Sequence, residues 1–169
     1  SVNLTQVVKN LANNLRVICS SFYFFDSSLI SDIMPQFLTK SGSFMTHIRI
    51  EPSIAAAIKN FKLPENLGFG QIMAPVMASC IYENGKWGEL ELLPYGPISM
   101  YPTAKVLHYA QEIFEGMKAY KNDKGEISLF RPEENMKRLN KSAVRMAMPE
   151  VPEEIFMNGL IELVRLDRD

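Results

Sequence analysis

The chain has 169 residues, 47% of them hydrophobic, and its 18 basic and 19 acidic side chains leave a net charge of −1. This composition is typical of a soluble globular protein with a substantial core, whereas a nucleic-acid partner would call for a basic excess that is missing here. Cys19 and Cys80 stand alone, so we expect reduced thiols, a cytoplasmic location and no disulfide framework or metal site. No apolar run approaches the roughly 20 residues that span a bilayer, so no membrane partner is expected.

Residues 1–44 differ in character from the rest. Asn3 and Gln6 at capping-box spacing predict an amphipathic helix with an apolar stripe that ends at Leu15, and a second helix is predicted from Ser28. The many serines are weakly similar to an organelle transit peptide, which a single arginine supports poorly. We favour translation from Met45, which makes residues 1–44 a helical extension of the gene model and residues 45–169 the folded domain.

The first part of the domain predicts one short helix and one hairpin. A helix opens at Glu51, buries one side and is stopped by Pro64. A strand over residues 77–83 is followed by Asn84-Gly85, a strong hairpin signal, and residues 87–93 are expected to return as its partner.

The second part predicts another hairpin and two long helices. We expect a helical turn over residues 105–113, strands over residues 115–121 and 126–130, a helix after Pro132 and a last helix from Pro152. The buried stripe of the first long helix is predicted to hold Met136, Leu139, Ala143 and Met146. An antiparallel sheet with flanking helices is an α+β fold.

Several blocks, spread over roughly the last three fifths of the chain, resemble one family. They are GFG at residues 68–70, ENGKWGELEL at 83–92, LHYAQEIFEGMKAY at 107–120, SLFRPEENMKRL at 128–139 and AMPEVPEE at 147–154. In this order they are similar to the branched-chain amino-acid aminotransferases, which are pyridoxal 5′-phosphate enzymes of fold type IV. The resemblance implies the small N-terminal domain of a homodimeric enzyme that moves an amino group between leucine, isoleucine or valine and 2-oxoglutarate.

The resemblance also implies that the catalytic lysine is missing. In fold type IV enzymes the Schiff-base lysine belongs to a larger second domain, beyond the point that corresponds to Asp169. Residues 163–167 run off a helix without a stop signal, which favours truncation before an interdomain linker. We therefore assign no catalytic residue and expect the isolated chain to be inactive.

Arg138 is the candidate cofactor-binding residue. The resemblance places it at the anchor for the cofactor phosphate, and a guanidinium suits that role because it grips phosphate with paired hydrogen bonds and keeps its charge. The alternative is a solvated helix face, because Lys141 and Arg145 follow at helical spacing.

The candidate substrate-binding residues are Phe69, Tyr109, Phe114 and Lys118. The three aromatic residues match positions that line the branched-chain pocket of the family, where rigid rings supply dry contact area. Ordinary core packing is the alternative for them, and Lys118 could instead extend into solvent. Glu115 is expected to hydrogen-bond locally beside Gly116, without an acid or base role.

The sequence departs from the family that it resembles at Ala74, Pro75 and Val76, where relatives usually carry polar residues before the position of Met77. That change puts the pocket edge and a subunit contact in doubt. Two other functions therefore stay open: a non-catalytic remnant that acts as a binding or assembly module, and a sister enzyme such as a D-amino-acid aminotransferase or aminodeoxychorismate lyase.

Overall fold

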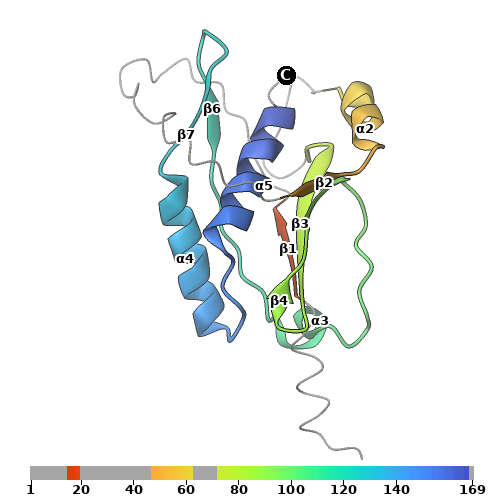
Figure 1. Ribbon diagram of the computed structural model, residues 1–169, viewed down its shortest axis with the longest axis vertical. Coiled ribbons are helices and arrows are strands. Elements are labelled where there is room, and N and C mark those ends of the chain that lie inside the picture. Colours follow the sequence, from red (N-terminus) through yellow and green to blue (C-terminus); the bar gives the residue numbers. More distant parts are fainter. Residues whose placement is uncertain (1–14, 20–46, 63–71, 168–169) are drawn as a thin grey trace, which may run out of the picture.

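The computed structural model describes residues 15–19, 47–62 and 72–167, and within them it combines two sheets with helices (Figure 1). The helices and strands, labelled as in the figure, are β1 (Leu15–Cys19), β2 (Ile48–Ile50), α2 (Ile54–Asn60), β3 (Val76–Glu83), β4 (Lys86–Trp87), β5 (Leu90–Pro94), α3 (Lys105–Tyr109), β6 (Ala119–Lys121), β7 (Ile127–Leu129), α4 (Pro132–Arg145) and α5 (Glu153–Leu166). Mixed helices and sheets confirm the α+β class.

The larger sheet is organised around β3. Its strand order is β1-β3-β5-β2, and β4 also pairs with β3. The pairs β1–β3, β3–β4 and β3–β5 are antiparallel, whereas β2–β5 is parallel. Pro75 lies one residue outside the β3 ladder, where its missing N–H costs nothing, and its carbonyl accepts a hydrogen bond from Tyr95 N at 2.9 Å.

The predicted Asn84-Gly85 turn is confirmed between β3 and β4. Both residues have positive φ, 53° and 82°, as a two-residue hairpin turn requires. The expected return strand over residues 87–93 is broken, because Gly88 N donates to Ile81 O at 2.8 Å and the chain then enters the sheet again as β5. A Cβ on Gly88 would lie only 3.2 Å from that oxygen, so a glycine suits this close approach.

The predicted second hairpin is confirmed only at its tip. Asn122 Oδ1 accepts hydrogen bonds from Lys124 N at 3.0 Å and Glu126 N at 2.9 Å, which closes the turn between β6 and β7. The strand expected over residues 115–121 is wrong for 115–118, since only β6 pairs. Helix α3 likewise stops early, because Ala110 has the left-handed conformation (φ 47°).

Helix α4 begins and ends with complementary charge. Pro132 occupies its first turn with Glu133 and Glu134, and Arg145 lies in its last turn, as the helix dipole favours. Met136, Leu139 and Ala143 are buried as predicted. Met146 is wrong as a core residue, because the helix ends at Arg145 and Met146 is 36% exposed.

Helix α5 contributes to two apolar clusters, one with each sheet. One side of it carries Gly159 and Leu163 against β3 and β5, so that a Cβ on Gly159 would meet Leu90 Cδ1 at 3.5 Å. Another side carries Leu160 and Val164 against the β6–β7 hairpin. Because α5 is apolar on both sides, it lies between α4 and the larger sheet (Figure 1).

The loop between α4 and α5 is held by side-chain hydrogen bonds. Asn140 Nδ2 donates to Val151 O and Asn140 Oδ1 accepts from Val151 N, both at 2.8 Å. Trp87 Nε1 donates to Glu150 O at 2.9 Å. These bonds link α4 to the α4–α5 loop, and that loop to the β3–β4 hairpin. They therefore fix the position of α4 relative to the larger sheet.

Leu15 begins a strand and does not end a helix. The five residues of β1 pair with β3, from Leu15 opposite Tyr82 to Cys19 opposite Ala78. The helices predicted from Asn3 and from Ser28, and Pro64, lie outside the described residues. None of the helices in the described ranges has the length and apolar content to cross a bilayer.

Candidate anion site

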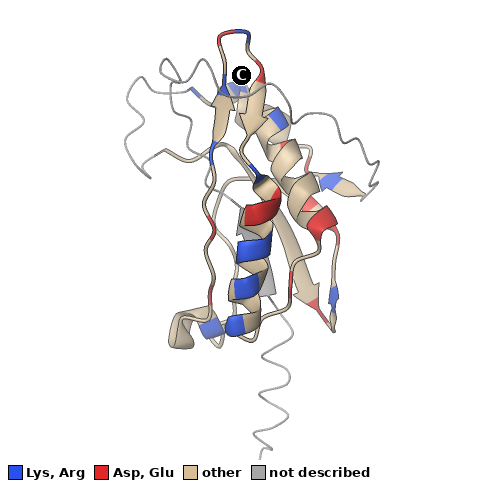
Figure 2. Ribbon diagram, turned by 90° about the vertical axis from the view of Figure 1, so that its left-hand side faces the viewer, with Lys and Arg blue, Asp and Glu red and all other residues tan. Residues whose placement is uncertain are grey.

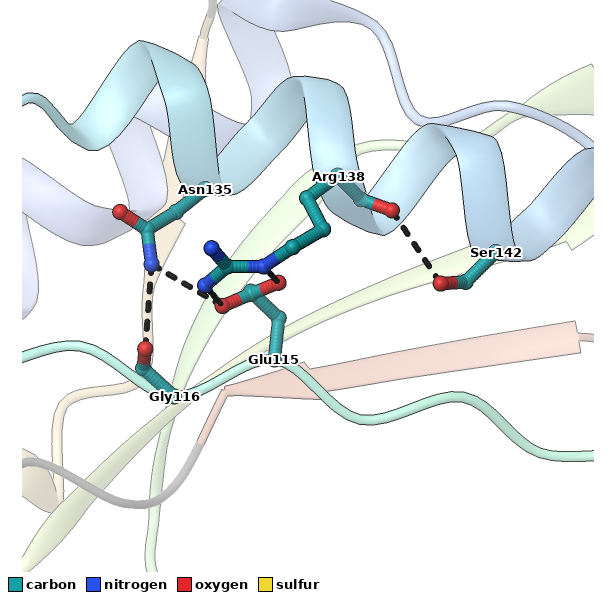
Figure 3. A network of polar contacts seen from close by, with 5 residues as sticks. All are labelled: Glu115, Gly116, Asn135, Arg138 and Ser142. Atoms are coloured by element: carbon teal, nitrogen blue, oxygen red, sulfur yellow. Dashed lines mark hydrogen bonds and ion pairs between the residues drawn. The ribbon is translucent and has the colours of Figure 1, made fainter.

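Figure 3 draws the polar network around Arg138, which joins Asn135, Arg138 and Ser142 of α4 to Glu115 and Gly116 of another segment. Arg138 Nε donates to Glu115 Oε2 at 2.7 Å, and Arg138 Nη2 donates to Glu115 Oε1. Asn135 Nδ2 donates to Glu115 Oε1 and to Gly116 O, each at 3.0 Å. Asn135 and Arg138 share one face of α4 because they are three residues apart, while Glu115 and Gly116 belong to the extended segment before β6.

The two side chains of the Arg138–Glu115 ion pair differ in their exposure to solvent. The Glu115 side chain is 8% exposed, whereas that of Arg138 is 65% exposed. The hydrogen bond from Arg138 holds the pKa of the Glu115 carboxyl below its usual range, against the opposing effect of burial and with help from Asn135. The pKa of Arg138 is raised by the same pairing. Both groups are therefore charged at neutral pH, and the open side of the guanidinium faces outward.

After the acidic first turn of α4, all of its charged side chains are basic, and Figure 2 shows them along the helix. Lys137 pairs with Glu134 on the helix itself at 2.8 Å. Lys141 and Arg145 continue the basic face, as the solvated alternative expected. Arg138 differs from a simple solvated residue because its partner lies 23 positions away in another segment.

The sequence-predicted substrate residues do not line a closed pocket in the described part of the chain. Tyr109 at the end of α3 is 79% exposed and Phe114 is 81% exposed, and Lys118 is also exposed. Phe69 lies outside the described residues. Core packing is therefore wrong as an explanation for Tyr109 and Phe114, while their role in substrate binding stays a prediction.

Phe114 lies close to the anion site. A Cβ on Gly116 would be 3.4 Å from Phe114 Cζ, so the missing side chain leaves room for this ring beside the residue that Asn135 binds. The extended segment thus presents an exposed aromatic ring and a buried carboxylate at adjacent positions.

The sequence missed two features of the site. Asn135 was not singled out, although its position three residues before Arg138 is the signal that both face the same way. Glu115 was expected to bond locally, which is wrong, because its partners lie on α4, 20 and 23 residues away. His108 in α3 has Nε2 2.5 Å from Pro102 O. In the described ranges no three His, Cys, Asp or Glu side chains gather to hold a metal ion.

Fold and site together define an α+β domain that presents a fixed, outward-facing arginine. No protein-family profile matches the chain. It is 51% identical over 104 residues to a probable branched-chain-amino-acid aminotransferase of Staphylococcus aureus, a match that covers 61% of this chain and 29% of the relative. It is 45% identical over 107 residues to branched-chain-amino-acid transaminase 1 of Bacillus subtilis, covering 63% and 30%. For the branched-chain-amino-acid aminotransferase of Mycolicibacterium smegmatis the identity is 48% over 103 residues, covering 60% and 28%.

These matches confirm the resemblance to the branched-chain amino-acid aminotransferases over about three fifths of the chain. The matched segment spans about 30% of the length of these curated relatives.

Proposed function

We propose that this chain is the small N-terminal domain of a branched-chain amino-acid aminotransferase and that Arg138 anchors the phosphate of pyridoxal 5′-phosphate. The observation that carries the proposal is the fixed guanidinium of Arg138, which keeps an exposed edge within a segment similar to these enzymes. In this proposal residues 45–169 are the part similar to the enzyme domain, to which β1 adds a strand from the upstream residues, and the cofactor-holding lysine belongs to the part of the enzyme outside the matched segment.

The residues present suit the phosphate of the cofactor. A phosphate carries up to two negative charges and accepts several hydrogen bonds, and a guanidinium offers paired donors that cannot lose their charge. Glu115 already neutralises Arg138 in part, so the remaining donors bind an anion through hydrogen bonds more than through net charge. When bound, the cofactor supplies the group that takes an amino group from one substrate and passes it to another.

We further propose that the exposed aromatic residues orient the substrate. Tyr109 and Phe114, with Phe69, provide apolar contact for leucine, isoleucine or valine side chains once the rest of the enzyme covers them. Lys118 provides positive charge near the substrate carboxylate or 2-oxoglutarate. We place the enzyme in the cytoplasm as a homodimer.

The competing functions are less well supported. The names of the relatives quoted above all specify branched-chain amino acids, which favours that substrate class over a D-amino-acid aminotransferase.

The test is the intact mass of the native protein from its source cells, captured with an antibody to this chain and treated with borohydride to trap pyridoxyl-lysine. We expect a mass well above 19.2 kDa together with a pyridoxyl adduct. A native mass of this chain, or of a chain that starts at Met45, without an adduct would overturn the proposal in favour of a binding module.

A further inference from the structure

We propose that Glu115 is a positioning residue for the anion site: it holds one edge of the Arg138 guanidinium so that the other edge is presented to a phosphate group. This inference rests on the proposed function and deepens it. It states that the Glu115 carboxylate and the Asn135 amide of this chain set the orientation of Arg138.

The two edges of the guanidinium are used differently. A guanidinium carries five N–H groups, one on Nε and two on each Nη. Glu115 accepts from Nε and from Nη2, which occupies the side edge of the group. The other edge keeps both N–H groups of Nη1 and one of Nη2, and no hydrogen bond to Nη1 is found among the described residues. That edge has the fork geometry that binds two oxygens of one phosphate.

Glu115 is itself held in place by the helix that carries Arg138. Asn135 donates to Glu115 Oε1 and, with the same amide group, to Gly116 O. The carboxylate is therefore fixed from two positions on α4, and its side chain is almost fully buried. Figure 3 shows Asn135 and Arg138 reaching from α4 to the Glu115 carboxylate, and the Arg138 side chain is 65% exposed.

Two effects of Glu115 on anion binding oppose each other. Its negative charge repels a phosphate, whereas its hydrogen bonds remove the rotamer freedom that Arg138 would otherwise lose on binding. We infer that the ordering effect is the larger, because Arg138 is mostly exposed and solvent screens the repulsion. The affinity of Glu115→Gln for a phosphate decides between the two effects: it falls if the ordering effect is larger and rises if the repulsion is larger.

The experiment compares two ligands on the 169-residue chain. The probes are 4-deoxypyridoxine 5′-phosphate and 4-deoxypyridoxine, which lack the aldehyde and so cannot react with surface lysines. The ratio of their dissociation constants, from calorimetric or NMR titration, isolates the contribution of the phosphate. The Arg Nε–H signals in a proton–nitrogen NMR spectrum report whether Arg138 is still held.

We expect the wild-type chain to prefer the phosphorylated probe and Arg138→Gln to lose the preference. Glu115→Gln should reduce it about five- to twentyfold, since it removes the charge-assisted hydrogen bonds that orient the arginine, and should shift the Arg138 Nε–H signal. Asn135→Ala should reduce the preference by a smaller factor. Glu134→Gln is the matched control, because it removes the same charge from the α4 surface without touching Arg138.

An unchanged or increased phosphate preference in Glu115→Gln, with the preference still lost in Arg138→Gln, would overturn the inference and leave the proposed anchor intact. A wild-type chain without any phosphate preference would overturn both. If Glu115→Gln does not fold, Asn135→Ala decides, because it keeps the Arg138–Glu115 pair and loosens only the carboxylate; no change in that variant would contradict the inference.

Discussion

Two carboxylates of this domain have opposite environments. Glu115 accepts hydrogen bonds from Arg138 and Asn135, which lower its pKa, so its contribution to stability is present above the unfolded pKa and is lost as the pH falls through the folded value. Asp167, at the end of α5, is buried without a hydrogen-bond partner for either oxygen among the described residues. Burial raises the pKa of Asp167 to about 6. Its contribution therefore has the opposite sign.

Replacing Asp167 with asparagine should raise the free energy of unfolding, relative to the wild type, by more at pH 8 than at pH 4.5. Between the unfolded pKa and about 6 the unfolded state ionises first, so stability falls as the pH rises, and above that range the folded state holds an unfavourable buried charge. Allowing for partial exposure, we expect the free energy of unfolding of Asp167→Asn to gain about 1–2 kcal/mol on the wild type between the two pH values.

Urea unfolding at both pH values measures this difference. Asp123→Asn, which removes a carboxylate from the exposed turn before β7, is the control for net charge. An equal effect of Asp167→Asn at the two pH values would show that the Asp167 carboxyl is not strained by burial.

At the scale of elements, the sequence predicts the turns correctly, because each turn is formed by neighbouring residues with the required backbone conformation or side-chain hydrogen bond. Asn84 and Gly85 adopt positive φ in the turn between β3 and β4, and Asn122 closes the β6–β7 turn through its own side chain. Such turns depend on residues two to four positions apart, so they can be predicted from the sequence. The strand expected over residues 115–118 is wrong for a non-local reason, because the Gly116 carbonyl accepts a hydrogen bond from Asn135 on α4 and does not pair with a neighbouring strand.

Gly85→Ala should destabilise the protein by about 1 kcal/mol, because a left-handed residue with a Cβ is strained. No atom lies within 4 Å of the added methyl group, so the cost is conformational and not steric. Gly96→Ala is the matched control: its methyl group also meets nothing within 4 Å, and its φ is not positive. Equal free energies of unfolding for the two variants would contradict the predicted turn strain.

At the scale of the whole molecule, the domain leaves much apolar surface in the open. The exposed large apolar side chains of the segment from residue 101 to the start of α4 are Tyr101, Leu107, Tyr109, Phe114 and Phe130. Exposed apolar side chains, where they gather, are typical of a surface that contacts another domain or a ligand. It therefore supports the proposal that Tyr109 and Phe114 are covered in the complete enzyme.

The purified 169-residue chain should show no amino transfer from leucine to 2-oxoglutarate in the presence of pyridoxal 5′-phosphate. One phosphate anchor binds the cofactor only weakly, and the resemblance assigns the lysine that holds the cofactor to another domain. Formation of labelled glutamate from nitrogen-15 leucine measures the activity, with an active aminotransferase as the positive control. Turnover that follows the chain through purification would overturn this account.

By itself, the sequence determined the α+β class, the turns, the two long helices and the resemblance to the branched-chain amino-acid aminotransferases, because these depend on local patterns and short blocks. It also singled out Arg138. Only the tertiary structure decided what surrounds that arginine: Glu115 and Asn135 meet because the extended segment before β6 packs beside α4. The exposure of Tyr109 and Phe114 was decided in the same way. Contacts across twenty or more residues depend on how elements pack, and no periodicity within one element encodes them.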